Sequence, residues 1–215
     1  MPTAILLVCL NCLKSKLLTI EKAGTAEQTI TKSRFIAWAA ACQSEQEVGA
    51  FLRAIAAQHQ NAHHLAYAFR VKTIDGLGNH IIVPRFSDAG EPSGTAGRPI
   101  LQMLEGQKLI NVAVGVIRYY GGVNLGTGGL ARAYGGTAKM ALDAAKIVPF
   151  VEMQLLKLSI HYKRVDELTN AVTKLNGKVI NKLFGDMSLN KKVHVQVSLP
   201  AIETKAFLER FSEHT

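Results

Sequence analysis

The chain has 215 residues, enough for one large or two modest domains, each with its own hydrophobic core. With 48% apolar and 19% charged residues, the composition excludes a disordered or low-complexity protein. The formal net charge of +9 favours polyanions such as nucleic acid, the ribosome or acidic protein surfaces, although an excess of lysine and arginine also serves plain solubility.

The N-terminal region carries two of the three cysteines and a short apolar run. Cys9, Cys12 and Cys42 are too few and odd in number for a disulfide framework, which indicates a reducing compartment and hence the cytoplasm. Cys9 and Cys12 form a C-x-x-C pair, which we interpret as chance because no second pair or nearby histidine completes a zinc site. The apolar run 4–10 is too short to span a bilayer and fits either a strand or a leader upstream of the native start, so we expect no membrane association.

The first part of the chain predicts alternating strands and helices. In chain order we expect an extended segment 17–31, a strand 33–41, a helix 44–59, strands 64–72 and 81–83 around a turn 75–79, a short helix 100–105, a buried strand 112–120 and a helix 127–146. Ser44 and Glu47 are spaced as in a capping box at the start of the first helix. Alternation in 64–72 predicts one core face and one basic face, the latter carrying Arg70 and Lys72.

Pro149 marks the expected boundary between two domains, residues 17–149 and 150–215. Beyond it the pattern predicts strands 152–162, 178–184 and 189–199 and helices 165–176 and 201–211. This βαββα order is that of a ferredoxin-like half-sandwich that lacks its last strand. Either another element supplies that edge or the sheet has three strands.

The loop "FSDAGEPSGTAGRP", residues 86–99, is rich in glycine and proline and holds two carboxylates. Asp88 and Glu91 are compatible with an acid–base pair or with a water-bearing metal site. The simpler alternative is that Asp88 caps a turn and Glu91 pairs with Arg98 or Arg85. Since no histidine or third carboxylate is arranged beside them, we favour this alternative and assign no catalytic residue.

The segment "VIRYYGGVNLGTGGLARAYGG", residues 116–136, leads from a buried strand through glycines into a helix. The first amides of a helix have no internal partner, and glycines let an anion approach them closely, so this junction predicts a phosphate site. Guanidinium groups bind phosphate and aromatic rings stack on bases. The candidate phosphate- and base-binding residues are therefore Arg118, Tyr119, Tyr120, Gly126, Thr127, Gly128, Gly129, Arg132 and Tyr134.

Two nucleotide motifs are excluded at this junction. The spacing of Gly126, Gly128 and Ala131 fits a dinucleotide fingerprint, but the required acidic residue after the next strand is missing, and no Lys-Ser or Lys-Thr completes a Walker A loop. We therefore expect no cofactor. The alternative is that the glycines only permit close packing and that the tyrosines belong to the core.

Polar residues outside the junction provide secondary candidates for the same surface. Lys32 and Arg34 lie in the sequence "TKSRF", and His63 and His64 precede a strand. A zincin motif would need Glu beside the first histidine of the 59–63 pair, where Gln60 stands, so we expect no metal. Asp88, Glu91 and Arg98 complete the secondary set.

Together the "TKSRF" segment, the His63–His64 pair and both glycine-rich motifs closely resemble the YigZ/IMPACT family over residues 31–150. The resemblance implies an α+β fold: a ribosomal-protein-like N-terminal domain with a left-handed βαβ crossover, and a ferredoxin-like C-terminal domain similar to the late domains of elongation factor G. It also implies a link to translation, since the eukaryotic relatives regulate translation through a protein partner. The family usually has a second Asp where this chain has Ala89.

Three functions follow as hypotheses. The first is a non-enzymatic regulator of translation that binds RNA or the ribosome, suggested by the charge and by the Arg/Tyr/Gly junction. The second is an enzyme acting on a phosphorylated small molecule, with phosphate on the amides of 126–129 and Asp88 or Glu91 as metal ligand or base. The third is a protein-interaction module with a translation-related partner.

Overall fold

The computed structural model describes residues 17–184 and 192–211, which divide into two compact units after Phe150. The apolar run 4–10, the Cys9–Cys12 pair and the first residues of the strand expected at 189–199 lie outside the described residues. The elements of the first unit are β1 (Leu18–Lys22), β2 (Gly24–Ile30), β3 (Ser33–Ala41), α2 (Glu45–Gln58), β4 (His64–Ile74), β5 (His80–Ser87), α3 (Gly97–Gly106), β6 (Val112–Tyr119), α4 (Gly126–Asp143) and β7 (Lys146–Pro149).

A five-stranded antiparallel sheet of order β2-β3-β6-β4-β5 forms the centre of the first unit. Since β3 and β4 each pair antiparallel with β6, they run parallel to one another, and the connection β3-α2-β4 is the expected βαβ crossover. Its left-handed sense stays a prediction. The short strands β1 and β7 pair separately, so the two ends of the unit lie side by side.

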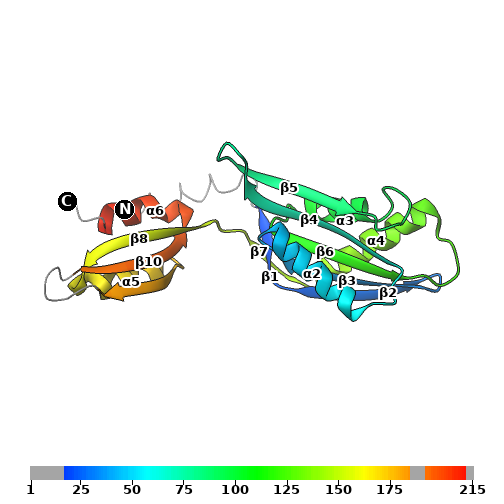
Figure 1. Ribbon diagram of the computed structural model, residues 1–215, viewed down its shortest axis with the longest axis horizontal. Helices are drawn as coiled ribbons and strands as arrows, with labels where there is room; N and C mark the ends of the chain where they lie inside the picture. The colour runs from blue at the N-terminus through cyan, green and yellow to red at the C-terminus, as the bar shows by residue number, and fades with distance from the viewer. Residues whose placement is uncertain (1–16, 185–191, 212–215) are drawn as a thin grey trace, which may run out of the picture. The chain divides into compact units, whose positions relative to one another are not determined.

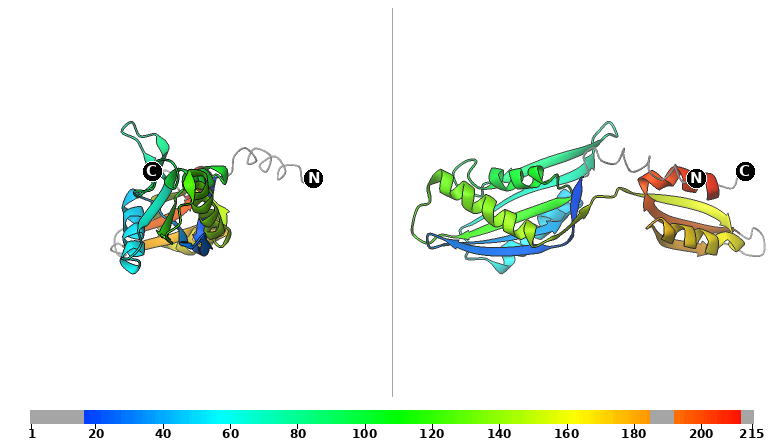
Figure 2. Two further views of the ribbon diagram at one scale, coloured as in Figure 1. Left: turned by 90° about the vertical axis from the view of Figure 1, so that its right-hand side faces the viewer. Right: turned by 180° about the vertical axis from the view of Figure 1, so that it is seen from behind.

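Helices cover both faces of the five-stranded sheet. Helix α2 lies on one face, in front of the sheet in Figure 1, where Val48 packs with Phe69 and Ala113 and Ile55 packs with Ile36 and Ile117. Helices α3 and α4 lie on the other face, in front in the right-hand view of Figure 2. The central strand β6 is consequently buried on both sides, as its unbroken apolar sequence predicts.

Helix α2 begins as its sequence predicts. Ser44 has extended backbone angles and its hydroxyl accepts a hydrogen bond from the Glu47 amide at 3.2 Å. The Glu47 carboxylate reaches back to the amide of Gln43 at 2.8 Å, one residue earlier than in an ideal capping box. The helix ends at Gln58 with His59 as its C-cap.

The prediction that only one face of β4 belongs to the core and that the other is basic is wrong. Ala66 and Ala68 on that face are completely buried, because α3 packs over it. Arg70 is half-buried there, and its Nη1 donates to the carbonyl of Leu109 at 2.8 Å. Both faces of β4 therefore belong to the core.

The second unit has the predicted βαββα order. Its elements are β8 (Met153–His161), the 3-10 turn η2 (Tyr162–Arg164), α5 (Val165–Lys174), β9 (Lys178–Phe184), β10 (Lys192–Pro200), η3 (Ala201–Glu203) and α6 (Thr204–Phe211). Within the described residues the sheet has three antiparallel strands in the order β8-β10-β9. Apolar residues of α5 and α6 cover one face of this sheet, and no described helix of this unit covers the other.

In the described part of the chain, no helix is long and apolar enough to cross a membrane.

Cys42 is a buried residue of the first unit, and burial raises the pKa of its thiol to about 11.

The cap of α2 provides a test of the first unit. We expect Ser44→Ala to lower the free energy of unfolding by about 1 kcal/mol, because the Glu47 amide loses its acceptor, whereas Ser44→Gly costs only a few tenths. Urea denaturation followed by circular dichroism measures both. Equal losses in the two variants would contradict the capping role.

Candidate nucleic-acid interface

The loop between β5 and α3 is held by the side chain of Asp88. Its Oδ1 accepts hydrogen bonds from the amides of Ala96 and Gly97 at 2.9 and 2.8 Å, and its Oδ2 accepts one from Gly94 at 2.8 Å. Burial alone would raise the pKa of Asp88, but the three backbone hydrogen bonds outweigh it and hold the pKa below its usual value. The carboxylate is thus occupied in closing the loop onto the start of α3, as the capping alternative predicts.

The next residue is Ala89, at the position where the resemblance implies a second Asp. Ala89 has φ of 50°, in the left-handed region, where Asp is better tolerated than Ala. Its carbonyl lies 2.8 Å from Nδ1 of His64. The position at which the resemblance implies Asp is therefore a tight turn held against β4.

Glu91 lies at the centre of a buried polar cluster. Its Oε1 accepts from Nη1 of Arg118 at 2.8 Å and from the hydroxyl of Tyr134 at 2.8 Å. Ser33 accepts a further hydrogen bond from Nη2 of Arg118 at 3.2 Å, and Nε2 of His64 lies 3.8 Å from the same Glu91 oxygen. The cluster connects the loop, β3, β4, β6 and α4.

The predicted partners of Glu91 are wrong. Arg98 is exposed on α3, and Nε of Arg85 lies 3.7 Å from a carboxylate oxygen of Glu45. Arg118 pairs with Glu91 because it points to the side of β6 that α3 and α4 cover, where a charge needs a buried counter-ion.

Arg118 and Tyr134, predicted to contact phosphate and to stack on bases, belong to the interior. Arg118 is 4% exposed and its guanidinium lies 5.5 Å from the ring centre of Phe35 and 5.1 Å from that of Tyr120. Tyr134 is completely buried and meets Phe35 edge to face. Burial, together with the hydrogen bond to Glu91, raises the pKa of Tyr134, so its hydroxyl stays protonated and donates. The alternative that the tyrosines belong to the core is correct for Tyr134.

Several other candidates are engaged locally. The hydroxyl of half-buried Tyr119 lies 2.9 Å from Nδ1 of His59, on the α2 side of the sheet. Arg34 binds both carboxylate oxygens of Glu27 at 2.6 and 2.9 Å. His63 accepts a hydrogen bond from the Tyr120 amide at 3.3 Å. No group of three or more potential metal ligands occurs in the residues that the structure describes.

The remaining candidates gather at one exposed end of the first unit. We call this the junction surface; it consists of Lys32, Tyr120, Gly126, Thr127, Gly128 and Arg132. The turn between β2 and β3 lies against the end of β6, where a Cβ on Gly121 would come within 2.1 Å of the Lys32 carbonyl oxygen. Only glycine permits this approach, which places the backbone of Lys32 against the segment that leads from β6 to α4.

Helix α4 begins at the junction surface without a side-chain cap. Leu125 at the N-cap position provides no acceptor, and Gly126 has φ of 68°. Gly129, the last of the predicted glycines, is half-buried within the first turns. The first amides of α4 are thus left for solvent or for a ligand.

A groove of about 550 Å³ runs along the exposed side of α4. Its α4 wall contains Leu125, Gly129, Arg132, Ala133, Gly136 and Met140, and its opposite wall contains Gln28, Ile30 and Thr31. The sequence gives no motif for the opposite wall. The feature of the sequence that could have indicated this wall is the alternation along residues 24–30, which places Gln28 and Ile30 on one face of an edge strand.

The contribution of Asp88 to stability is expected to depend on pH. Because the folded-state pKa of Asp88 lies below the unfolded value of about 3.9, its stabilisation is present above that pH and is lost as the pH falls through the folded pKa. We expect Asp88→Asn to lose about 2 kcal/mol at neutral pH, and the gap to the wild type to close as the pH falls below about 4. Urea denaturation across pH measures this, with Asp143→Asn, an exposed partner of Lys139, as the control.

The buried ion pair makes a second prediction. Arg118→Met or Glu91→Leu alone should cost about 3–5 kcal/mol, since each leaves a buried charge unpaired. The double variant should lose less than the sum, with a coupling of about 1–3 kcal/mol. The exposed pair Arg34 and Glu27, changed in the same way, should couple by under about 1 kcal/mol. Additive losses at Arg118 and Glu91 would rule out the pairing.

Comparison with known proteins places this arrangement in a family. Residues 31–142 match the model of the Impact N-terminal domain. The chain is 34% identical to the IMPACT family member YvyE of Bacillus subtilis, covering 92% of this chain and 86% of that protein. It is 32% identical to the IMPACT family member YigZ of Escherichia coli, covering 88% of each.

A solved structure supports the two-domain α+β fold. The crystal structure of a hypothetical protein matches with a TM-score of 0.63 and 31% identity, covering 92% of both chains. The sequence relatives span both units, and the family model covers the loop, the buried cluster and the junction surface. The chain therefore belongs to the IMPACT family.

Proposed function

We propose that the junction surface binds the sugar–phosphate backbone of RNA and that the protein acts in the cytoplasm as a non-enzymatic, ribosome-associated regulator of translation. The observation that carries the proposal is an uncapped helix start beside exposed cations. Lys32 and Arg132 are exposed and have no hydrogen-bond or ion-pair partner in the described chain. A helix N-terminus and free cations both attract phosphate.

The glycines of α4 support the same binding mode. A Cβ on Gly128 would meet only the Arg132 side chain at 3.6 Å, and one on Gly136 only the Gln28 side chain at 3.6 Å. Packing within the unit therefore does not require glycine at either position, although each glycine costs the helix about 1 kcal/mol relative to alanine. A ligand that approaches the helix backbone closely would account for both.

Tyr120 provides a surface for a base. Its ring is 41% exposed beside the start of α4 and rests on the guanidinium of Arg118. Stacking on aromatic rings is tolerant of base identity. This arrangement favours a single-stranded RNA segment with its phosphates toward Lys32 and Arg132.

The translational part of the proposal rests on family membership, including the expectation of a translation-related protein partner. The enzymatic alternative loses support because Asp88 is engaged by three amides and Glu91 is buried against Arg118 and Tyr134. Neither carboxylate is left to act as base or metal ligand at the surface.

The proposal predicts a charge-specific loss of RNA binding. Arg132→Gln and Lys32→Gln should each weaken binding of a mixed-sequence single-stranded RNA and lower the salt slope by about 0.7. Fluorescence anisotropy from about 50 to 200 mM salt measures both quantities. Arg118 is unsuitable for this test because it is buried.

Arg53→Gln is the matched control, because Arg53 is exposed on α2, which covers the opposite face of the sheet. Equal effects of all three substitutions would mean that binding depends only on the net charge of the protein, and would overturn the assignment to the junction surface. Absence of RNA binding by the wild type would overturn the proposed function, and nuclease-resistant co-purification of a protein would then favour an interaction module.

A further inference from the structure

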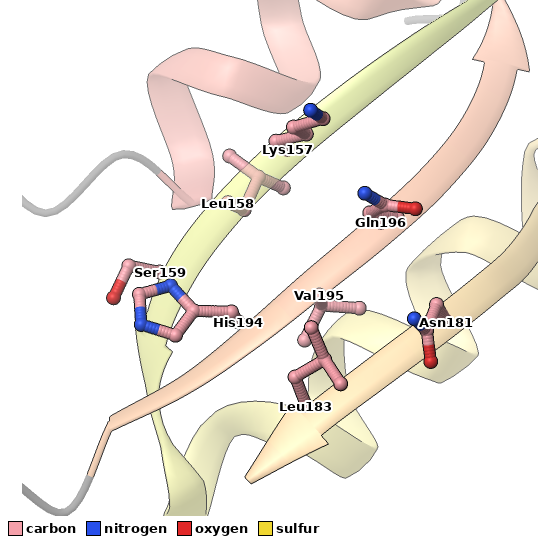
Figure 3. A pocket seen from close by; sticks show the side chains of 8 residues that line it. All are labelled: Lys157, Leu158, Ser159, Asn181, Leu183, His194, Val195 and Gln196. Carbon is pink, nitrogen blue, oxygen red and sulfur yellow. The ribbon is translucent and has the colours of Figure 1, made fainter. Parts of the chain in front are cut away.

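The second unit presents a sheet face that no described helix of this unit covers. Register pairs place Lys157, Gln196 and Asn181 in one row across β8, β10 and β9, and Ser159, His194 and Leu183 in the next. These six side chains line a shallow pocket of about 310 Å³ (Figure 3). Val193, Val195 and Val197 alternate with them and point to the helices instead.

Charge is distributed unevenly between the two layers of this unit. Strands β8, β9 and β10 contain no Asp or Glu in their described residues. Described acidic residues of the unit lie before β8 or on the helical layer: Glu152, Asp166, Glu167, Glu203 and Glu209. The lysines of the open sheet face therefore have no carboxylate on the strands to offset their attraction for a polyanion.

Two arginines of the helical layer have an acidic partner, whereas two lysines of the strands have none in the described chain. Arg164 and Arg210 of the helical layer both bind Glu167, at 3.2 and 2.9 Å. Lys157 and Lys178 are exposed on the strands and have no hydrogen-bond or ion-pair partner in the described chain. Lys178 pairs in register with Ser198, two residues beyond Gln196, so it continues the same open face.

The other side chains of the face suit bases. Asn181 and Gln196 each present an amide donor and acceptor, Ser159 a hydroxyl, and His194 an exposed ring. Leu183, 58% exposed, and Leu155, 56% exposed, provide apolar contact. Open sheet faces of this kind bind unstacked bases of single strands, whereas duplex RNA hides its base edges.

A second copy of the chain fits this face poorly. A two-fold interface would set the same patch against itself, and the open strands would bring lysines together without a carboxylate to offset them. Charge complementarity instead favours a polyanion.

We infer that the open face of the β8-β10-β9 sheet is a second binding surface for single-stranded RNA. Lys157 and Lys178 contact phosphates, His194 stacks on a base, and Gln196 and Asn181 hydrogen-bond to base edges. The inference rests on the proposed function, since it assumes that RNA is the ligand. It adds a surface in a unit that the family's N-terminal motif does not include.

The test uses the full chain and a mixed-sequence single-stranded RNA containing 4-thiouridine. We expect Lys157→Gln to lower the salt slope by about 0.7, and His194→Ala to weaken binding by about tenfold through the loss of stacking. Photo-crosslinks should map to peptides of β8 or β10. The control is Lys205→Gln, which removes an exposed, unpartnered cation from α6 and should leave the affinity unchanged.

The outcomes separate this inference from the proposed function. Wild-type RNA binding that Arg132→Gln weakens but Lys157→Gln and His194→Ala do not, with crosslinks confined to the first unit, overturns the second surface and leaves the proposed function in place. Loss in Lys157→Gln with retained thermal stability supports the second surface. A wild type that binds no RNA but retains an acidic protein after nuclease treatment overturns both.

Discussion

The buried carboxylate of Glu91 is the interaction on which the first unit depends. One of its oxygens accepts hydrogen bonds from Arg118 of β6 and Tyr134 of α4, and Arg118 reaches Ser33 of β3. A buried charge is tolerated only when its partners satisfy it, so these elements are constrained to a single arrangement. The same loop is closed by Asp88, whose carboxylate accepts hydrogen bonds from the amides of Ala96 and Gly97 at the start of α3.

This constraint decides which residues remain for a ligand. Arg118 and Tyr134 are used inside the unit, so the attraction for an anion depends on Lys32, Arg132 and the free amides of α4. The buried cluster nevertheless supports the surface above it, because Tyr120 rests on the guanidinium of Arg118 and Gly121 packs on Lys32. Interior and surface are therefore coupled through β6 and the residues that follow it.

The helices and strands could be predicted well because their positions depend on periodicity and capping, which are visible in the sequence. Examples are the Ser44 cap of α2 and the unbroken apolar strand β6. Periodicity and capping did not predict the partner of Glu91, since the choice among Arg85, Arg98 and Arg118 depends on which strand lies beside the loop in space. One signal was present: an arginine within a strand covered on both faces requires a buried anion. The basic face predicted for β4 was wrong because strand order, which sequence periodicity does not contain, places α3 over it.

In the second unit, acidic residues are found on the helices and are absent from the described residues of the strands. In its helical layer Arg164 and Arg210 bind Glu167, whereas Lys157 and Lys178 on its strands have no ion-pair partner in the described chain. Solubility alone would be served by lysines on either layer, and it does not account for strands free of acidic residues. On the proposal that both surfaces bind RNA, each raises the effective concentration of the other for a strand already held, so that weak contacts at each would suffice for a stable complex.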